Sequence, residues 1–261
     1  MKIVKPKRRD PIQALAIVSV VPLLIDIVLL VLVWHFASKQ LDRPYLPLPS
    51  DVMTRFVAEI QGDLLDEFGI SAYRVIVSVG IGVMLAAPLA IFCAQFKWLD
   101  RFVTPFMYFL YPAPKVVFLP LIISFLKLGD ESRIFLITLI IFFQVFVIIR
   151  DAASQVPQET IESLGSLGAN RWHTLRYIYV PVSIPAVMTA LKISAGTAIA
   201  VLFIAETFAG SNGLGYYIVN QWNRFDYDKM YAGILAMSLL GLGLFGIFAS
   251  LERVLTRWQR Q

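Results

Sequence analysis

Residues 156–172 read VPQETIESLGSLGANRW, which contains the signals of two short helices with a tight corner between them. Pro157 suits the first turn of a helix, where its missing N–H costs nothing. Apolar residues at three-residue steps give this helix a narrow apolar stripe: Ile161, Leu164 and Leu167. Gly168 can end the helix in a left-handed turn, and Asn170 can cap a second helix that continues toward Pro181. The stretch therefore predicts a helical hairpin.

Long apolar segments flank this hairpin on both sides. Hydrophobic residues make up 58% of the 261-residue chain and charged residues only 16%, whereas soluble domains have roughly 45–50% and about 25%. A membrane helix needs about 20 mostly apolar residues. Six segments meet this criterion: Ile12–Phe36, Ala72–Phe96, Phe102–Phe125, Ile134–Ile149, Ile184–Ala209 and Met230–Leu251. We therefore expect an all-α polytopic membrane protein with six transmembrane helices.

The third of these spans contains a run that cannot be a regular helix, Tyr111-Pro112-Ala113-Pro114. Each proline removes a backbone donor and can kink its helix. Such a break is tolerated inside a membrane only where neighbouring groups satisfy the freed carbonyls. The run therefore predicts a broken third span and a packed bundle around it.

The first outer loop, residues 37–71, is too long to be a simple connector. It contains Ser50-Asp51, which we expect to cap a helix. Apolar residues follow at helical spacing: Val52, Phe56, Ile60 and Leu64. This pattern predicts an amphipathic helix near the outer surface.

The Lys and Arg residues of the connecting segments predict the orientation. With the N-terminus in the cytoplasm, the inner segments carry more of these residues than the outer segments, where Arg74 is one of the cations. This bias favours both termini in the cytoplasm. It also places the hairpin on the cytoplasmic side, between the fourth and fifth spans.

The hairpin resembles the EAA loop of binding-protein-dependent ABC importer permeases. That pattern is Glu-Ala-Ala, three residues, Gly, nine residues, Ile, one residue and Leu-Pro. The chain has matching residues at those spacings: Glu162, Gly168, Ile178 and Pro181. It departs from the pattern at Ser163 and Leu164, which stand for the two alanines, and at Val180, which stands for leucine.

Other motifs of the chain are similar to the same family. They are Leu46-Pro47-Leu48-Pro49-Ser50, Tyr111-Pro112-Ala113-Pro114-Lys115, Gly129-Asp130-Glu131-Ser132, Ala205-Glu206 and Gly213-Leu214-Gly215-Tyr216. The resemblance covers about residues 46–255. The nearest branch serves nitrate, sulfonate, taurine and related small organic solutes.

The resemblance implies the type I ABC importer permease fold, also called MetI-like, in one transmembrane domain over residues 1–261. Its core is expected over about residues 70–252. Residues 1–70 would form the first helix and the outer amphipathic helix. Residues 151–181 would form the cytoplasmic coupling loop.

The resemblance also implies the function and the partners. The chain would be a permease subunit that translocates a small solute, with anionic and sulfonate- or taurine-like solutes as candidates. Its partners would be cytoplasmic ABC ATPase subunits, a second permease copy in a homodimer, an extracytoplasmic solute-binding protein and the lipid bilayer of the inner (plasma) membrane. The coupling residues would be Glu162, Leu164, Leu167, Gly168, Ala169 and Arg171, with Glu162 and Arg171 able to pair at the rim.

Several classes of function find no support in the sequence. No Gly-x-x-x-x-Gly-Lys-Ser/Thr phosphate loop is present, so ATP-Mg should be bound by the partner ATPase, and we expect no enzyme activity and no cofactor in this chain. Cys93 is the only cysteine, and one cysteine supports no metal site. Nucleic acid is not expected as a partner, because the basic residues lie between hydrophobic segments.

Charged residues within spans cost about 2.5–3.5 kcal/mol on insertion scales, so each raises a functional question. Asp26, Lys115 and Glu206 are candidates for the substrate path, and each can instead pair within the bundle. Lys192 can extend its side chain to the inner interface. Lys115 follows the double-proline break, where a cation would suit an anionic solute.

Two other classes of function remain open at this stage. An ion-coupled secondary transporter could use Asp26 and Glu206, although such carriers often have inverted repeats, and none is evident in this sequence. An intramembrane enzyme would need a reactive constellation of side chains, and none is evident either.

Overall fold

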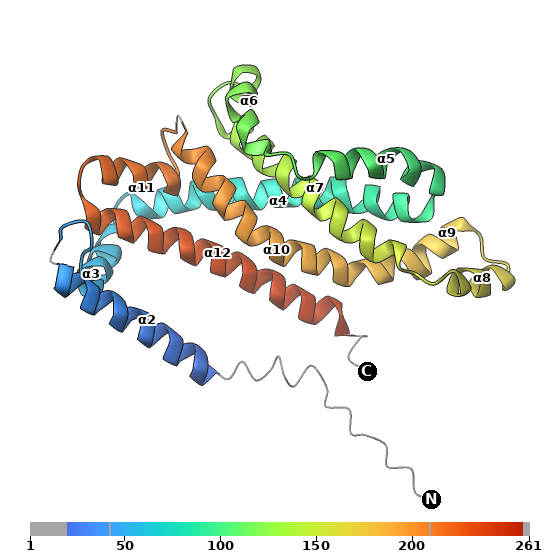
Figure 1. The fold of residues 1–261 in the computed structure, drawn as a ribbon, viewed down its shortest axis with the longest axis horizontal. Helices are drawn as coiled ribbons and strands as arrows, with labels where there is room; N and C mark the ends of the chain where they lie inside the picture. The colour runs from blue at the N-terminus through green and yellow to red at the C-terminus, as the bar shows by residue number, and fades with distance from the viewer. Residues whose placement is uncertain (1–19, 42, 209, 258–261) are drawn as a thin grey trace, which may run out of the picture.

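A computed structural model describes residues 20–41, 43–208 and 210–257, and these residues form an elongated bundle of helices (Figure 1). The helices, in chain order, are α2 (Val20–Leu41), α3 (Pro49–Glu59), α4 (Leu64–Gln95), α5 (Lys97–Leu110), η1 (Lys115–Phe118), α6 (Leu119–Leu126), α7 (Asp130–Ser154), α8 (Gln158–Ser166), α9 (Arg171–Thr174), η2 (Leu175–Tyr179), α10 (Val180–Thr207), α11 (Leu214–Asn223) and α12 (Tyr227–Leu255). The expected all-α class is confirmed.

Five of the described helices are long and apolar enough to cross a membrane. They are α2, α4, α7, α12 and the continuous helix Arg171–Thr207, which joins α9, η2 and α10. The helix α5 and the segment Lys115–Leu126, which joins η1 and α6, are bent by 84° relative to each other and together make a sixth candidate span. The structure therefore has five candidate spans, or six when the bent pair counts as one span, and the break expected at residues 111–114 is present.

The boundaries of the first two spans differ from those expected. The helix α4 begins at Leu64, well before Ala72. Asp66 and Glu67 lie in its first helical turn, where negative charge is stabilised by the helix dipole. In the first span the described helix runs to Leu41, and residues 12–19 of the expected segment lie outside the described ranges.

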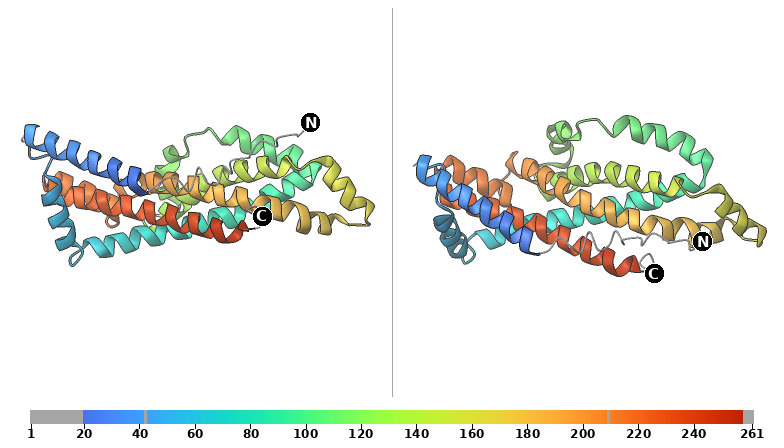
Figure 2. Two further views of the ribbon diagram at one scale, coloured as in Figure 1. Left: turned by 90° about the horizontal axis from the view of Figure 1, so that it is seen from below. Right: turned by 60° about the horizontal axis from the view of Figure 1, so that its bottom comes forward.

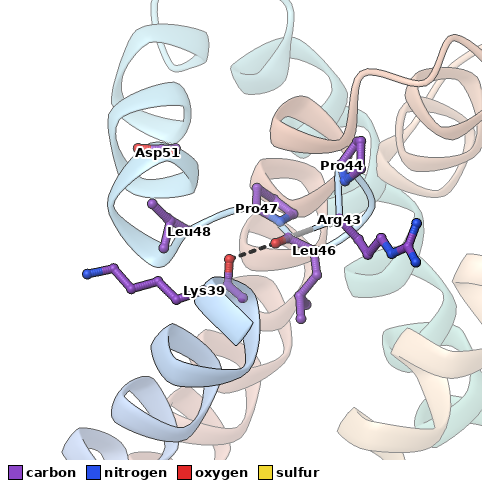
Figure 3. A pocket seen from close by; sticks show the side chains of 8 residues that line it. Lys39, Arg43, Pro44, Leu46, Pro47, Leu48 and Asp51 are labelled. Atoms are coloured by element: carbon purple, nitrogen blue, oxygen red, sulfur yellow. Dashed lines mark hydrogen bonds between the residues drawn. The ribbon is translucent and has the colours of Figure 1, made fainter. Parts of the chain in front are cut away.

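The amphipathic helix after the first span is present as α3, but its expected cap is wrong. The helix begins at Pro49 with Leu48 as N-cap and without a side-chain cap. Proline suits this first position because its φ is already helical, so Ser50 falls inside the first turn. The corner before α3 is closed by Ser38, whose Oγ donates a hydrogen bond to the carbonyl oxygen of Leu46 at 2.7 Å (Figure 3).

The core of the bundle lies where α4, α7 and α10 pack together. Ala86, Ile141 and Ala198 are fully buried there. At Gly82 the backbone of α4 comes so close to α7 that an added Cβ would lie 2.9 Å from Cγ2 of Ile141. Small residues at such crossings let membrane helices approach closely.

This close crossing gives the first testable prediction. Gly82→Val should lower the free energy of unfolding by about 1–3 kcal/mol, because overpacking displaces buried neighbours. Gly80→Val in the same helix is the matched control, since no atom lies within 4 Å of a Cβ built there. Thermal unfolding in detergent should separate the two variants. Equal midpoints would contradict the tight crossing of α4 and α7.

The two ends of the bundle carry different elements. The hairpin of α8 and α9 lies at one end, whereas α3 and α11 lie at the opposite end (Figures 1 and 2). The helix α2 touches α12 where the ring of Trp34 stacks on Tyr231 with 5.5 Å between centroids. Side chains of α2 are otherwise mostly exposed, with 6% of its apolar window buried.

Candidate functional site

The corner of the hairpin is built as its sequence predicts. The N–H of Gly168 donates to the carbonyl oxygen of Gly165 at 2.9 Å, and the N–H of Ala169 to that of Leu164 at 3.4 Å. This pair of bonds is the Schellman motif, which closes a helix with a left-handed residue. Gly168 has φ +81°, a conformation that glycine adopts without steric cost.

The second arm of the hairpin begins with a complete capping box. Asn170 Oδ1 accepts the N–H of His173 at 3.0 Å, and Nδ1 of His173 accepts the N–H of Asn170 at 3.3 Å. From Arg171 the chain then continues through one π-helical segment as a single helix to Thr207. The expected boundary between the second short helix and the fifth span is therefore absent, and the hairpin is a direct extension of that span.

The hairpin is attached to the ends of two other spans. Leu175 and Tyr179 are buried in a small cluster with Ala153 of α7. Nε2 of Gln95, at the end of α4, donates to the carbonyl oxygen of Arg171 at 2.6 Å. The guanidinium of Arg171 lies 5.6 Å from the ring centroid of Phe96. A force on the hairpin therefore reaches α4, α7 and α10 together.

The tip of the hairpin leaves large apolar side chains in solvent. Leu167 is 83% exposed and Trp172 is 62% exposed. Exposed apolar groups of this size mark docking surfaces when they are clustered. Glu162 is exposed and accepts a hydrogen bond from Gln158. Among the described ion pairs none joins Glu162 to Arg171, so the rim pairing within the hairpin is not formed.

A cavity of about 310 Å³ lies beside the broken span. It is lined by Tyr111, Ala113, Lys115, Val116, Ile140, Gln144, Thr197 and Val201. The break, α7 and α10 therefore meet at one cavity with both apolar and polar side chains in its wall. Gln144 and Thr197 were missed in the sequence, because single uncharged polar residues do not stand out within apolar spans.

Lys115 lies in the wall of this cavity but is also used by the break itself. Its Nζ donates to the carbonyl oxygens of Leu110 and Tyr111, at 2.8 Å each, and of Ala113, at 3.3 Å. These carbonyls lie at the end of α5 and in the turn after it, where helical partners run out, and that of Leu110 also accepts the N–H of Ala113 at 3.2 Å. Its Nζ also lies 4.6 Å from the ring centroid of Phe143. Lys115 therefore caps the broken helix and places its charge near the cavity.

Glu206 is at the centre of a buried polar cluster at the opposite end from the hairpin. Both Glu206 and Arg74 have side chains with 0% exposure, and Nη1 of Arg74 donates to Oε1 of Glu206 at 2.6 Å. Nη2 of Arg74 contacts Asp130 at 2.6 Å. We call this cluster the Glu206 network, defined by Ser71, Arg74, Asp130, Glu206 and Asn212. Arg74, assigned to an outer loop in the sequence, is instead a core residue of α4.

The remaining charged residues of the spans are placed separately. Asp26 lies exposed on α2. Lys192 contacts Glu252 at 2.7 Å and so joins α10 to α12 instead of extending alone to the interface. Within the described ranges, no hydrogen bond or ion pair connects Asp26, Lys115 and Glu206 to one another.

Comparison with known proteins agrees with these features. Residues 86–257 match the family described as "Binding-protein-dependent transport system inner membrane component". The taurine transport system permease protein TauC of Escherichia coli (strain K12) is 29% identical over 88% of this chain and 86% of its own length. The putative aliphatic sulfonates transport permease protein SsuC of the same organism is 25% identical, over 88% of each chain.

A solved structure with the same fold is an inward-facing conformation of the MetNI methionine ABC transporter. It superposes with a TM-score of 0.63 at 17% identity, covering 76% of this chain and 98% of the other. This likeness confirms the expected MetI-like fold. The family match also removes the secondary transporter and the intramembrane enzyme as alternatives, and it confirms a multi-pass inner-membrane component. The chain belongs to the family of binding-protein-dependent transport system inner membrane components and is the non-catalytic permease subunit of an ABC importer.

Proposed function

We propose that two copies of this chain form the translocation path for a small taurine-like or other sulfonate solute, delivered by an extracytoplasmic binding protein. Two ATPase subunits bind ATP-Mg and engage the hairpins, and both termini lie in the cytoplasm. One observation carries the proposal: the doubly capped hairpin continues without a break into the helix that reaches Thr207.

The coupling step follows from this continuity. The proposed contact surface comprises Glu162, Leu164, Leu167, Gly168, Ala169 and Arg171 within residues 151–181 of the single domain 1–261. When ATP binding brings the two ATPase subunits together, each hairpin moves with the ATPase surface to which it is bound. Because α10 is the same helix, the motion reaches the outer end of the bundle. The hairpin must then bind the ATPase with different free energies in the two conformations.

The proposed path runs along the cavity at the broken span. The charge of Lys115 raises the local concentration of an anionic group, while Gln144 and Thr197 offer hydrogen bonds to it. The names of the relatives TauC and SsuC support a sulfonate class. Of the other two candidates, we propose that Glu206, which is fully buried, acts on the path indirectly, while Asp26 lies exposed on α2.

Transport assays of the complete complex test this function. Proteoliposomes that contain the permease and its ATPase should transport labelled taurine across the membrane. This requires ATP on the side of the membrane that carries the ATPase and the binding protein on the opposite side. An uncoupler should leave this uptake unchanged while ATP is maintained. Uptake that collapses with the uncoupler under these conditions would contradict an ATP-driven mechanism.

The cavity gives a second prediction. Lys115→Met should raise the KM for taurine uptake roughly tenfold, since losing one charge-assisted contact costs about 1.5–3 kcal/mol. Lys127→Met is the control, because Lys127 is an exposed cation at the end of α6. The amount of permease in the membrane should be equal in both variants. An unchanged KM in Lys115→Met would remove this residue from the path.

A further inference from the structure

The helix α11 begins with N–H groups whose partners come from other helices. The N–H of Gly215 donates to Oε2 of Glu206 at 2.8 Å, and the N–H of Leu214 to Oγ of Ser71 at 2.8 Å. The N–H of Gly213 donates to the carboxylate of Glu67. The first N–H groups of a helix have no partner within it, and a negative charge there is stabilised by the helix dipole. The start of α11 is therefore held by α4 and α10.

The loop before α11 wraps closely around Glu206. An added Cβ at Gly215 would lie 2.8 Å from Cβ of Glu206 and 2.9 Å from the carbonyl oxygen of Phe203. A side chain at Gly213 would collide with the carboxylate of Glu206 and with Nη1 of Arg74, and Gly213 has φ +101°. Glycine is thus required at both positions for the start of α11 to contact the carboxylate of Glu206.

Glu206 is also the point where three spans meet α11. Arg74 of α4 joins Glu206 of α10 to Asp130 of α7, and it donates to the backbone oxygen of Asn212 at 3.1 Å. These contacts lie at the end of the bundle opposite the hairpin (Figure 1). None of the atoms of Glu206 reaches solvent, so its carboxylate does not touch a solute.

We propose that Glu206 is a positioning residue for transport, which holds α11 against the outer ends of α4, α7 and α10 so that the four elements move as one unit. This inference rests on the proposed function, in which that end faces outward. The outer mouth then stays closed by α11 until the hairpins move, and it opens between the two copies of the chain. If the anchor is lost, α11 can swing free and the mouth leaks without ATP.

Replacing Glu206 by glutamine separates anchoring from folding. Arg74 keeps both of its bonds to Asp130 in this variant, so the three spans stay joined. The start of α11 loses the charge of the carboxylate that accepts the N–H of Gly215, while the carboxylate of Glu67 remains at Gly213. The bond from Nη1 of Arg74 loses its charged acceptor as well. A merely structural role would lower yield and stability without opening the path.

A cysteine reporter in the cavity measures this opening. Cys93→Ala removes the only native cysteine, and Thr197→Cys places a thiol in the cavity wall. The variant with both changes serves as the parent. In proteoliposomes with the ATPase, a membrane-impermeant thiol reagent on the outside should label the parent only when ATP and vanadate trap the complex. With Glu206→Gln, labelling without nucleotide should be roughly tenfold faster or more, as expected for one lost charge-assisted bond.

Glu252→Gln is the matched control. It makes the same chemical change in the other ion pair of α10, with Lys192, and should label as slowly as the parent. Slow labelling of Glu206→Gln without nucleotide would overturn the proposal. A parent that is never labelled in the trapped state would instead contradict the proposed path.

Hydrogen exchange tests whether Glu206 anchors α11 even if the parent is never labelled in the trapped state. In the purified complex, the amides of residues 213–217 should be protected with and without nucleotide. Glu206→Gln should speed their exchange roughly tenfold while the amides of α12 remain unchanged. Equal protection of residues 213–217 in both proteins would show that Glu206 does not anchor α11.

Discussion

A permease that folds normally but no longer retains its ATPase is the expected product of Gly168→Asp. The residue lies at the exposed corner of the hairpin with φ +81°, and nothing in its own chain lies within 4 Å of an added Cβ. Aspartate tolerates the left-handed conformation better than most residues. Its carboxylate would therefore point away from the permease and, in the proposed complex, toward the ATPase.

The size of this effect follows from the buried charge. An unpaired charge in a closed interface costs about 3–5 kcal/mol, which corresponds to roughly 100-fold weaker binding or more. Copurification of the ATPase with tagged permease, followed by a binding titration, measures it. The midpoint of thermal unfolding of the isolated permease should stay the same.

Gly168→Asn is the control for shape. Asparagine has nearly the same size and the same tolerance of a left-handed backbone, but carries no charge. It should weaken ATPase binding much less than aspartate does. Intact copurification together with intact transport in Gly168→Asp would remove the hairpin corner from the interface.

Arg74→Met should be the most destabilising single substitution among the variants proposed for this chain. It leaves Glu206 buried without its cation and takes a counter-ion from Asp130. Breaking a buried pair in this way costs about 3–5 kcal/mol. The unfolding midpoint in detergent should fall by roughly 10 °C, and the yield of the membrane-inserted protein should fall with it.

The double variant Arg74→Met with Glu206→Gln tests whether the two charges act as a pair. Once both are removed, no isolated carboxylate remains at position 206, so part of the lost stability should return. Residues in direct contact show such non-additive effects. Strictly additive losses would contradict the pairing and would assign the effect of Arg74 to Asp130 alone.

The sequence was sufficient for the parts of the fold whose signals are local. Gly168 and Asn170 specify the hairpin through neighbours within a few positions, and the double proline at 112 and 114 specifies the break. Six apolar runs specify the spans in the same way. Each of these features depends on a backbone preference or on a continuous stretch of residues.

The features that escaped prediction depend on contacts between distant segments. Arg74 was counted among the cations of the outer segments, and only the packing of α4 against α10 places it beside Glu206. For Lys115, the sequence did not reveal the three carbonyl oxygens to which its ammonium group donates beside the cavity. Such pairings carry no local signature.

The uninterrupted helix Arg171–Thr207 behaves mechanically as a lever. It has 37 residues, and at 1.5 Å rise per residue it is roughly 55 Å long. A tilt of about 10° around its middle would displace each tip by roughly 5 Å on that length. In the proposed complex, a small closing movement of the ATPase at one end of this helix would therefore separate side chains in contact at the other end, as long as the helix moves as a rigid body.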